Sequence, residues 1–200
     1  MFIVALNGSP KSDGNTAFLL QKILDEVGSE GAETRHIHVH KIMEEQKHPY
    51  CNACSSPCRG TCFSDTTLSD TYDLLKKADA IILGSPVYFG TVSAQLKGFW
   101  DKTRKLRGEK GLMNAVGGAV SPGGARFGGQ ETTLRALHDM MLVQGMIVVG
   151  DGYVADDCGH HGVCSQQPSE EDSFALKRAS ILSRRITEVA RATANLRIRE

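Results

Sequence analysis

The chain has 200 residues, of which 40% are hydrophobic and 23% are charged, and this composition is typical of a globular protein. Lys and Arg together number 23, as do Asp and Glu, so the formal net charge is zero and a nucleic-acid-binding protein, which needs a basic face, is not expected. The sequence has no apolar run of membrane-spanning length and no signal-peptide pattern at its start, so we expect a cytoplasmic protein that does not enter a membrane.

Strand and helix patterns alternate along the chain. Residues 2–6 form a continuous apolar run, which is typical of a strand buried on both faces. Apolar residues then recur at helical spacing up to Val27, and Gly28 stands where the helix is expected to end. Residues 34–40 alternate weakly and predict a second strand.

The later elements continue this alternation. Strands are expected at 80–84, 115–120 and 146–149, and helices at 68–75, 93–103 and 134–141. The last helix is expected to start at Ser169, with Asp172 completing a capping box.

Five strand-then-helix units predict a parallel sheet with helices on both faces. The expected fold is a single α/β domain over residues 1–200, a flavodoxin-like doubly wound sheet of five strands in the order 2-1-3-4-5. A cysteine-rich loop, 48–64, is inserted after strand 2. Ligands of such sheets bind beyond the carboxyl ends of the strands, so the loops after strands 1, 3 and 4 form the candidate site.

The loop after the first strand, 8–16, is rich in groups that bind anions. It leads into a helix, whose first N–H groups point at the site and carry partial positive charge. Glycines allow the backbone to curl around an anion, and the loop adds hydroxyls and one lysine: Gly8, Ser9, Lys11, Ser12, Gly14 and Thr16. We therefore predict a phosphate cradle; the alternative is an ordinary strand-to-helix turn.

The other two loops suit a planar ring. Residues 85–90 present the apolar and aromatic side chains Val87, Tyr88 and Phe89, which either contact a flat ligand or pack on the following helix. Residues 121–130 contain four glycines whose amides can approach the edge of a flavin, and Arg126 can pair with negative charge. The alternative for this second loop is a flexible surface segment.

The segments G-S-P-K-x-x-G-N-T, S-P-V-Y-F-G…L-K-G-F-W-D and G-G-A-R-F-G-G-Q-E-T-T resemble the NAD(P)H-dependent FMN reductase superfamily over residues 1–150. The resemblance implies bound FMN, with its phosphate at Ser9, Lys11, Asn15 and Thr16 and its ring and ribityl chain near 86–89 and 121–130. The predicted cofactor-binding residues are Ser9, Lys11, Gly14, Asn15, Thr16, Pro86, Val87, Tyr88, Phe89, Ser121, Gly123, Gly124, Arg126, Gly128 and Gly129.

Four cysteines lie within twelve residues, namely Cys51, Cys54, Cys58 and Cys62. In a reducing compartment such a cluster favours metal binding over disulfides, and four closely spaced thiolates favour a [4Fe–4S] cluster. The alternatives are zinc and cysteines without a metal, either as thiols or as disulfides. The spacing resembles the compact cysteine motif of the iron–sulfur flavoproteins, a subgroup that carries it between the second strand and second helix.

Two further groups of titratable residues have less specific patterns. Cys158, His160, His161 and Cys164 follow the fifth strand, and we interpret them as an active-site loop with incidental cysteines, their role left open. His36, His38 and His40 alternate on a predicted strand and are interpreted as a polar edge of the sheet, not as a ligand set.

The predicted function is that of an iron–sulfur flavoprotein, an FMN-dependent oxidoreductase passing electrons between a carrier such as ferredoxin, a [4Fe–4S] cluster, FMN and a small acceptor. The alternatives are an NAD(P)H-dependent FMN or quinone reductase with a structural cysteine loop, and a non-enzymatic flavodoxin-like electron carrier. Hydride transfer to a flavin requires stacking geometry instead of a protein acid or base, so no catalytic side chain is predicted. The resemblance also implies a homodimer or homotetramer.

Overall fold

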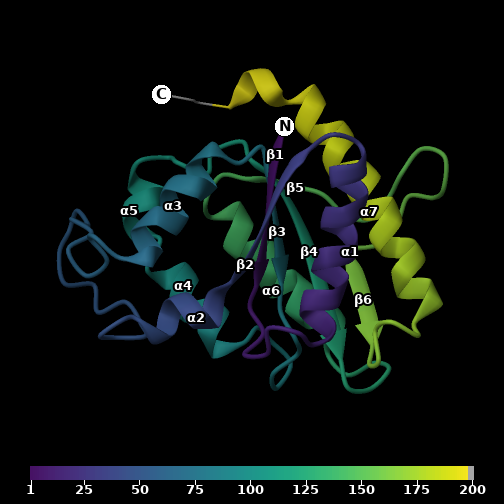
Figure 1. Cartoon of the computed structure of the whole chain (residues 1–200), viewed down its shortest axis with the longest axis horizontal. Coiled ribbons are helices and arrows are strands. Elements are labelled where there is room, and N and C mark those ends of the chain that lie inside the picture. The colour runs from purple at the N-terminus through teal and green to yellow at the C-terminus, as the bar shows by residue number, and fades with distance from the viewer. Residues whose placement is uncertain (198–200) are drawn as a thin grey trace.

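A computed structural model describes residues 1–197, and its centre is a six-stranded sheet (Figure 1). The strands are β1 (Phe2–Asn7), β2 (Glu33–His38), β3 (Ala80–Gly84), β4 (Val116–Gly123), β5 (Ile147–Val148) and β6 (Val163–Gln166). The helices are α1 (Asn15–Ser29), α2 (Val39–Glu44), α3 (Thr67–Lys77), α4 (Ala94–Asp101), α5 (Arg104–Gly108), α6 (Gln130–Leu142) and α7 (Ser173–Ala192), followed by the 3₁₀ turn η1 (Ala194–Leu196). The last residues of the predicted domain, 198–200, lie outside the described part.

The strand order is β2-β1-β3-β4-β5 and the pairs are parallel, which confirms the predicted flavodoxin-like order. The prediction of five strands is one strand short. β5 pairs only with Val116 and Gly117, and β6 takes its place beside residues 120–123 of β4. The sequence did not reveal β6 because its four residues, only two of them buried, do not alternate strongly enough to predict a strand.

Each face of the sheet has its own apolar core, because successive side chains of a strand point to opposite faces. Ile3 and Ala5 of β1 pack with α1 and α7, whereas Val4 and Leu6 pack with α2, α3, α4 and α6. Figure 1 shows this division, with α1 and α7 together on one side of the strands and α2, α3 and α4 on the other. The continuous apolar run of β1 is therefore explained by burial on both faces.

Several predicted boundaries are wrong. The second strand ends at His38 and α2 begins at Val39, so the cysteine-rich loop follows a short helix instead of the strand itself. Helix α1 continues through Gly28 to Ser29, and the turn is made by Gly31, whose φ of +88° favours glycine.

The last helix begins at Ser173, not at Ser169. Asp172 is the N-cap, and its side chain accepts a hydrogen bond from the Ala175 N–H at 3.0 Å. The Ser169 hydroxyl is instead 2.7 Å from the hydroxyl of Ser165 in β6, so it does not cap α7. Tertiary contact with β6 thus overrides the local capping pattern.

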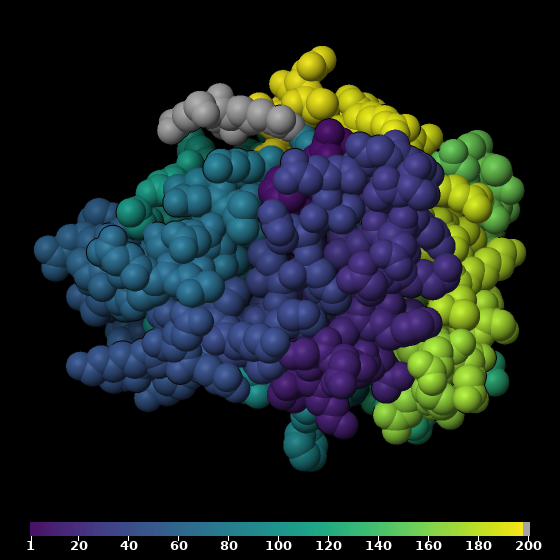
Figure 2. All heavy atoms as spheres, in the orientation of Figure 1, coloured from purple at the N-terminus to yellow at the C-terminus, as the bar shows by residue number. Residues whose placement is uncertain are grey.

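The carboxyl ends of β1, β3, β4 and β6 meet at one edge, which is the lower edge in Figure 1. The cysteine-rich loop, 48–64, contains no helix or strand and projects from the side of the molecule (Figures 1 and 2). Over residues 1–197, none of the helices is both long and apolar enough to cross a membrane.

Candidate functional site

The loop between β1 and α1 is shaped by the buried side chain of Asn7. The Asn7 Oδ1 atom accepts a hydrogen bond from the Ser9 N–H at 2.9 Å, and its Nδ2 atom donates to the Lys11 carbonyl at 3.1 Å. The Ser9 hydroxyl accepts from the Lys11 N–H at 3.1 Å. The curvature of this loop is therefore supported by hydrogen bonds within the protein. Asn7 was not predicted as a site residue, although a polar residue ending an apolar strand was a usable signal.

The N-terminus of α1 provides free backbone donors at this loop. Its N-cap is Gly14, no side chain in the described chain caps it, and its first turn contains no acidic residue. The first N–H groups of a helix have no partner within the helix, and the helix dipole favours a negative charge there. A phosphate meets the donors and field it needs at this position, so the residues fit the predicted cofactor.

Close packing brings the ends of β1 and β3 together beneath the loop. The Gly8 N–H donates to the Gly84 carbonyl at 2.8 Å. A Cβ atom on Gly8 would lie 2.7 Å from the Leu96 Cβ, and one on Gly84 would lie 2.8 Å from the Thr16 Cγ2. Because real Cβ contacts are not this short, only glycine is accommodated at these two positions without movement.

The loops after β3 and β4 are bonded to each other and to the first loop. The Val87 N–H donates to the Pro122 carbonyl at 3.1 Å, and the Ser93 hydroxyl donates to the Gly8 carbonyl at 2.5 Å. The structure thus brings together the three segments that the sequence predicted as one site. Ser93, which also caps α4 by accepting from the Leu96 N–H at 3.2 Å, is a second contributor that was not predicted.

Aromatic side chains at this edge extend into solvent. Phe89 and Phe127 are 106% and 94% exposed, and both have positive φ values, of 48° and 60°. A non-glycine residue in this conformation costs free energy and is often found at ligand sites. The segment containing Phe89 projects from the lower edge in Figure 2. Tyr88 is also exposed, so these rings do not pack on the following helix.

The predicted loop 121–130 begins later than expected. Ser121 and Gly123 belong to β4, where they pair with Cys164 and Gln166 of β6. The Ser121 hydroxyl oxygen is buried and has no hydrogen-bond partner within the described chain. A buried hydroxyl without a partner is unfavourable in the free protein and marks an acceptor or donor position for a ligand or water.

Asn15 and Thr16 differ from the other predicted phosphate ligands in their surroundings. The Asn15 Oδ1 atom accepts a hydrogen bond from the Ser169 N–H at 2.7 Å, which ties the start of α1 to the segment before α7. Thr16 is buried, with its methyl group directed at Gly84. The roles of these two residues toward phosphate stay predictions, and the geometry favours their backbone N–H groups as the donors.

The four cysteines of the loop 48–64 are free thiols, and Cys54 and Cys62 are exposed. Within residues 1–197, no three His, Cys, Asp or Glu side chains have the arrangement of a metal site. Four free thiols on one short segment are nevertheless the donor set of a Cys₄ iron–sulfur or zinc centre. The chemistry of the donors fits a metal centre, whereas their present positions require the loop to close around it, as is usual for metal sites.

Tyr72 of α3 lies beneath this loop. Its ring packs edge-on against Phe63 and Phe99, and its hydroxyl donates to the Phe99 carbonyl at 3.2 Å. Burial raises the pKa of the Tyr72 hydroxyl, and the thiols of Cys62, Cys51 and Cys58 raise it further.

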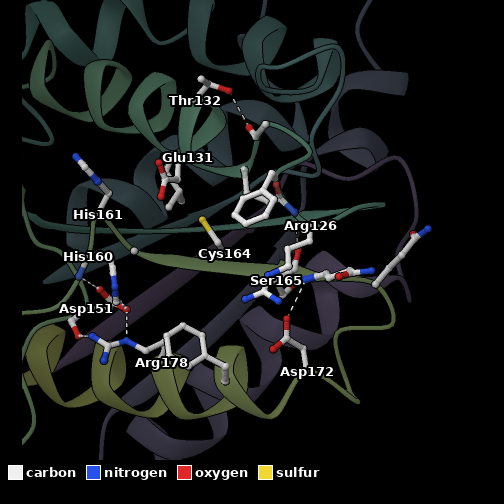
Figure 3. A pocket seen from close by; sticks show the side chains of 18 of the residues that line it. Arg126, Glu131, Thr132, Asp151, His160, His161, Cys164, Ser165, Asp172 and Arg178 are labelled. Carbon is white, nitrogen blue, oxygen red and sulfur yellow. Dashed lines mark hydrogen bonds and ion pairs between the residues drawn. The ribbon is translucent and has the colours of Figure 1, made fainter.

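A cavity of about 940 Å³ opens on the β6 side of the glycine-rich loop (Figure 3). Arg126 and Gly129 of the predicted flavin site line it, together with Glu131 of α6 and Cys164 of β6. Burial raises the pKa of the Cys164 thiol to about 12, with Glu131 and Asp151 adding to the effect, so this thiol is protonated at neutral pH. The volume is that of a small-molecule site.

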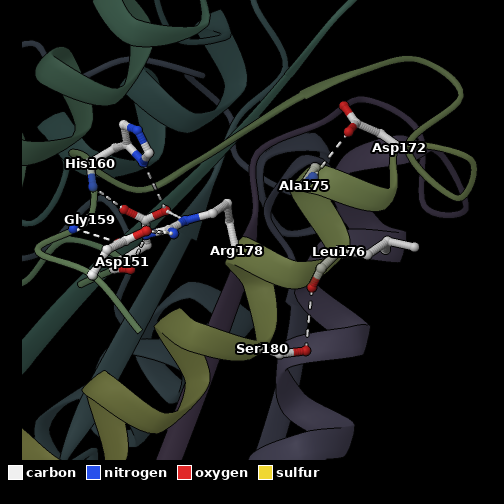
Figure 4. Close-up of polar contacts among 9 residues, drawn as sticks. Asp151, Gly159, His160, Asp172, Ala175, Leu176, Arg178 and Ser180 are labelled. Carbon is white, nitrogen blue, oxygen red and sulfur yellow. Dashed lines mark hydrogen bonds and ion pairs between the residues drawn. The ribbon is translucent and has the colours of Figure 1, made fainter. Parts of the chain in front are cut away.

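A buried ion pair anchors the segment that borders this cavity. Arg178 of α7 donates from its Nε atom to the Asp151 carboxylate at 2.5 Å and from its Nη1 atom to Asp157 at 2.9 Å (Figure 4). The Asp151 carboxylate also accepts the backbone N–H of His160. The segment between β5 and β6 is thus attached to α7 by Arg178, and the Arg184 Nη1 atom adds an ion pair with Asp156 at 3.6 Å. The sequence did not identify Asp151 and Arg178, because the pairing is made across 27 residues.

Comparisons with known proteins agree with this arrangement. The family model for NADPH-dependent FMN reductase matches residues 1–161. An iron-sulfur flavoprotein of Methanocaldococcus jannaschii is 39% identical over 195 residues, which cover 96% of this chain and 98% of that protein. An NAD(P)H dehydrogenase (quinone) of Chromohalobacter salexigens is 42% identical over 91 residues, covering 44% of this chain and 45% of that protein.

Solved structures share the fold. A flavodoxin, WrbA-like protein from Agrobacterium tumefaciens superposes with a TM-score of 0.65 at 22% sequence identity. The superposition covers 96% of this chain and 97% of that chain. At this level of identity the likeness establishes the fold alone.

Proposed function

This chain belongs to the NADPH-dependent FMN reductase family, and from this premise we propose that it binds one FMN at the loops after β1, β3 and β4. The observation that carries the proposal is the uncapped N-terminus of α1 beside a loop already curved by Asn7. The phosphate would accept from the backbone N–H groups of residues 14–16 and from Lys11 and Ser9. The ring would lie between 86–89 and 123–129, where aromatic side chains are open to solvent.

Bound FMN supplies redox chemistry in one- or two-electron steps, and the chain's own task is to hold and orient it. The backbone donors hold the phosphate end, the glycines allow close approach, and the exposed rings leave one face accessible. The protein is therefore a flavin-dependent redox protein in which no side chain needs to transfer a proton.

Titration of the FMN-free chain with FMN tests this proposal, and we expect one FMN per chain with quenched flavin fluorescence. Lys11→Met removes a charge-assisted contact, which we expect to weaken FMN binding about tenfold to a hundredfold. Lys177→Met, which removes an exposed lysine of α7, is the matched control. Equal affinity of both variants would argue against a phosphate at Lys11.

We propose further that Cys51, Cys54, Cys58 and Cys62 hold a [4Fe–4S] cluster, which exchanges single electrons. The support is the free Cys₄ donor set and the similarity, over nearly the full chain, to a protein named as an iron-sulfur flavoprotein. Iron, sulfide and zinc analysis of anaerobically purified protein tests the assignment: about four irons per chain is expected, and one zinc would refute it.

The electron donor separates two candidate functions. The partial similarity to an NAD(P)H dehydrogenase (quinone) supports an NAD(P)H-dependent quinone reductase, whereas a Cys₄ cluster supports a one-electron carrier such as ferredoxin as the partner. We propose the second. Reduction of the FMN-loaded protein by reduced ferredoxin, with no oxidation of NADH or NADPH in the presence of a quinone, is the expected result. Turnover of NAD(P)H by iron-free protein would select the first.

We also propose a homo-oligomer. Phe89 and Phe127 are fully or nearly fully exposed at one edge of the molecule, and a second copy of this chain would bury them. Light scattering of the full chain should give at least a dimer, and Phe89→Ser with Phe127→Ser should reduce the measured mass. A monomer at micromolar concentration would contradict this.

A further inference from the structure

A histidine lies behind the phosphate loop, in contact with the residue that shapes it. His38 ends β2 and is the direct neighbour of Asn7 across the parallel pair β1–β2. The His38 Nδ1 atom is 3.1 Å from the Asn7 Nδ2 atom. The same Asn7 amide is hydrogen-bonded to the backbone of Ser9 and Lys11. Asn7 therefore connects His38 directly to the backbone of the phosphate loop.

The orientation of the Asn7 amide follows from its other two partners. The Ser9 N–H can only donate, so it must face the Oδ1 atom, and the Lys11 carbonyl can only accept, so it must face the Nδ2 atom. The atom of Asn7 that faces His38 is therefore a donor. His38 has to accept at Nδ1, which requires a neutral ring with its proton on Nε2.

We propose that His38 is a positioning residue for phosphate binding: as the neutral Nε2–H tautomer it accepts from Asn7 and keeps the first loop in its curved form, and protonation of His38 releases Asn7 and weakens the grip on phosphate. This inference rests on the proposed function, because the ligand is the FMN phosphate. Protonated His38 would oppose an N–H group to the Asn7 N–H. Asn7 cannot turn over to relieve this, because the turned amide would oppose both Ser9 and Lys11.

The surroundings of His38 favour the neutral ring at neutral pH. Burial lowers the pKa of His38, and the nearby Lys41 of α2 and His40 lower it further. The His36 ring lies 4.7 Å and the His40 ring 6.3 Å from the His38 ring, and the facing loop contains the charged residues Lys11 and Asp13. His40 makes a second contact to this loop, with its Nε2 atom 3.4 Å from the Ser12 hydroxyl.

The shape of the first loop depends on pH through the charge of His38. The loop keeps its shape while His38 is neutral, above its lowered pKa, and is released as the pH falls through that value. Because protonation of His38 weakens phosphate binding, linkage requires bound phosphate to disfavour the protonated ring, so the release occurs at lower pH in the FMN complex than in FMN-free protein. The second pKa of the FMN phosphate is about 6, and its effect on the pH dependence of the Kd is the same in every variant.

The experiment measures the Kd of FMN from pH 5 to 8 for the full-length chain and three variants. His38→Asn places an uncharged acceptor oxygen where Nδ1 was, so we expect near wild-type affinity at pH 7.5 and less loss on acidification than in the wild type. His38→Leu removes the acceptor and should weaken binding about tenfold at pH 7.5. His36→Asn is the matched control, because His36 contacts Gln21 of α1 instead of the loop.

The outcomes separate this inference from the proposed function. Failure of the wild type to bind FMN at pH 7.5 would overturn the proposed function. A His38→Asn variant with the full wild-type pH profile, or a His38→Leu variant with wild-type affinity, would overturn the role of His38. ¹⁵N shifts of the His38 ring in FMN-free protein give a readout without ligand: a proton on Nδ1 would refute the contact with Asn7, and a proton on Nε2 is expected.

Discussion

The strand-end loops and the cysteine-rich loop differ in how each acquires its shape. The loop after β1 is stabilised by buried contacts of Asn7, Gly8 and Ser93, which connect it to the sheet and to α4. The second, 48–64, has no helix or strand, and its four thiols are free. A ligand site built on strand ends is therefore preorganised, whereas a site built on a long loop takes its order from what it binds.

This contrast has a physical origin in loop length. Residues 8–14 connect two buried elements, so ordering them costs little beyond what the sheet already requires. Residues 45–66 connect α2 to α3 and contribute few side chains to the core, of which Phe63 is the largest. The proposed cluster, with four protein ligands, would replace the missing apolar contacts with bonds to metal.

We expect the largest effect from a substitution in the cysteine-rich loop, which tests whether this loop and the strand-end loops are independent. Cys58→Ser removes one of four ligands, and we expect iron content to fall to near zero while the Kd of FMN changes by less than about twofold. Iron analysis and an FMN titration measure the two quantities. Cys158→Ser, at an exposed cysteine outside the loop, should keep full iron. Loss of FMN together with iron would show that the regions are coupled.

The second test concerns the packing that preorganises the first loop. Gly8→Val forces side-chain atoms against the Leu96 side chain and the Gly84 carbonyl, so we expect a loss of about 1–3 kcal/mol in unfolding free energy and weaker FMN binding. Urea unfolding measures the first effect. Gly108→Val is the control, because a Cβ atom at Gly108 would meet no atom within 4 Å. Equal losses in both variants would rule out close packing as the cause.

Hydrogen exchange compares the two regions directly. We expect the amides of 51–62 in metal-free protein to exchange on the order of a hundredfold or more faster than those of β3, because they lie in a segment without regular structure. Reconstitution with iron and sulfide should slow the loop amides and leave β3 unchanged. Slow exchange in the metal-free loop would show that it is already ordered.

The smallest effect is a pH dependence of stability at the edge of the sheet. Burial, reinforced by the neighbouring His38, lowers the pKa of His36 from 6.5 to about 4. The unfolded chain therefore binds a proton at higher pH than the folded chain, so the stability from the neutral ring is complete above about pH 6.5 and decreases toward pH 4. His36→Asn should reduce the acid dependence of Tm, and His48→Asn in the exposed loop should not.

The layers of this fold could be predicted from the sequence, and so could the position proposed for its site. Continuous apolar runs at 2–6 and 80–84 predict central parallel strands, and a parallel sheet carries its ligands at the carboxyl ends. The glycines and hydroxyls of 8–16 predict an anion-binding loop, and the four cysteines predict a second, metal-binding region. These features are local in the chain, so composition and spacing are enough to reveal them.

The residues that support the candidate site could be identified only from the tertiary structure. The contacts of Asn7 with His38, of Ser93 with Gly8 and of Asp151 with Arg178 join residues separated by 31, 85 and 27 positions, and no local pattern encodes them. β6 pairs with residues 120–123 of β4, beyond the two residues that pair with β5. Ser169 does not cap α7, because its hydroxyl forms a hydrogen bond with the hydroxyl of Ser165. Buried polar groups form hydrogen bonds with the groups that the fold brings close in space, and these partners are often distant in the sequence.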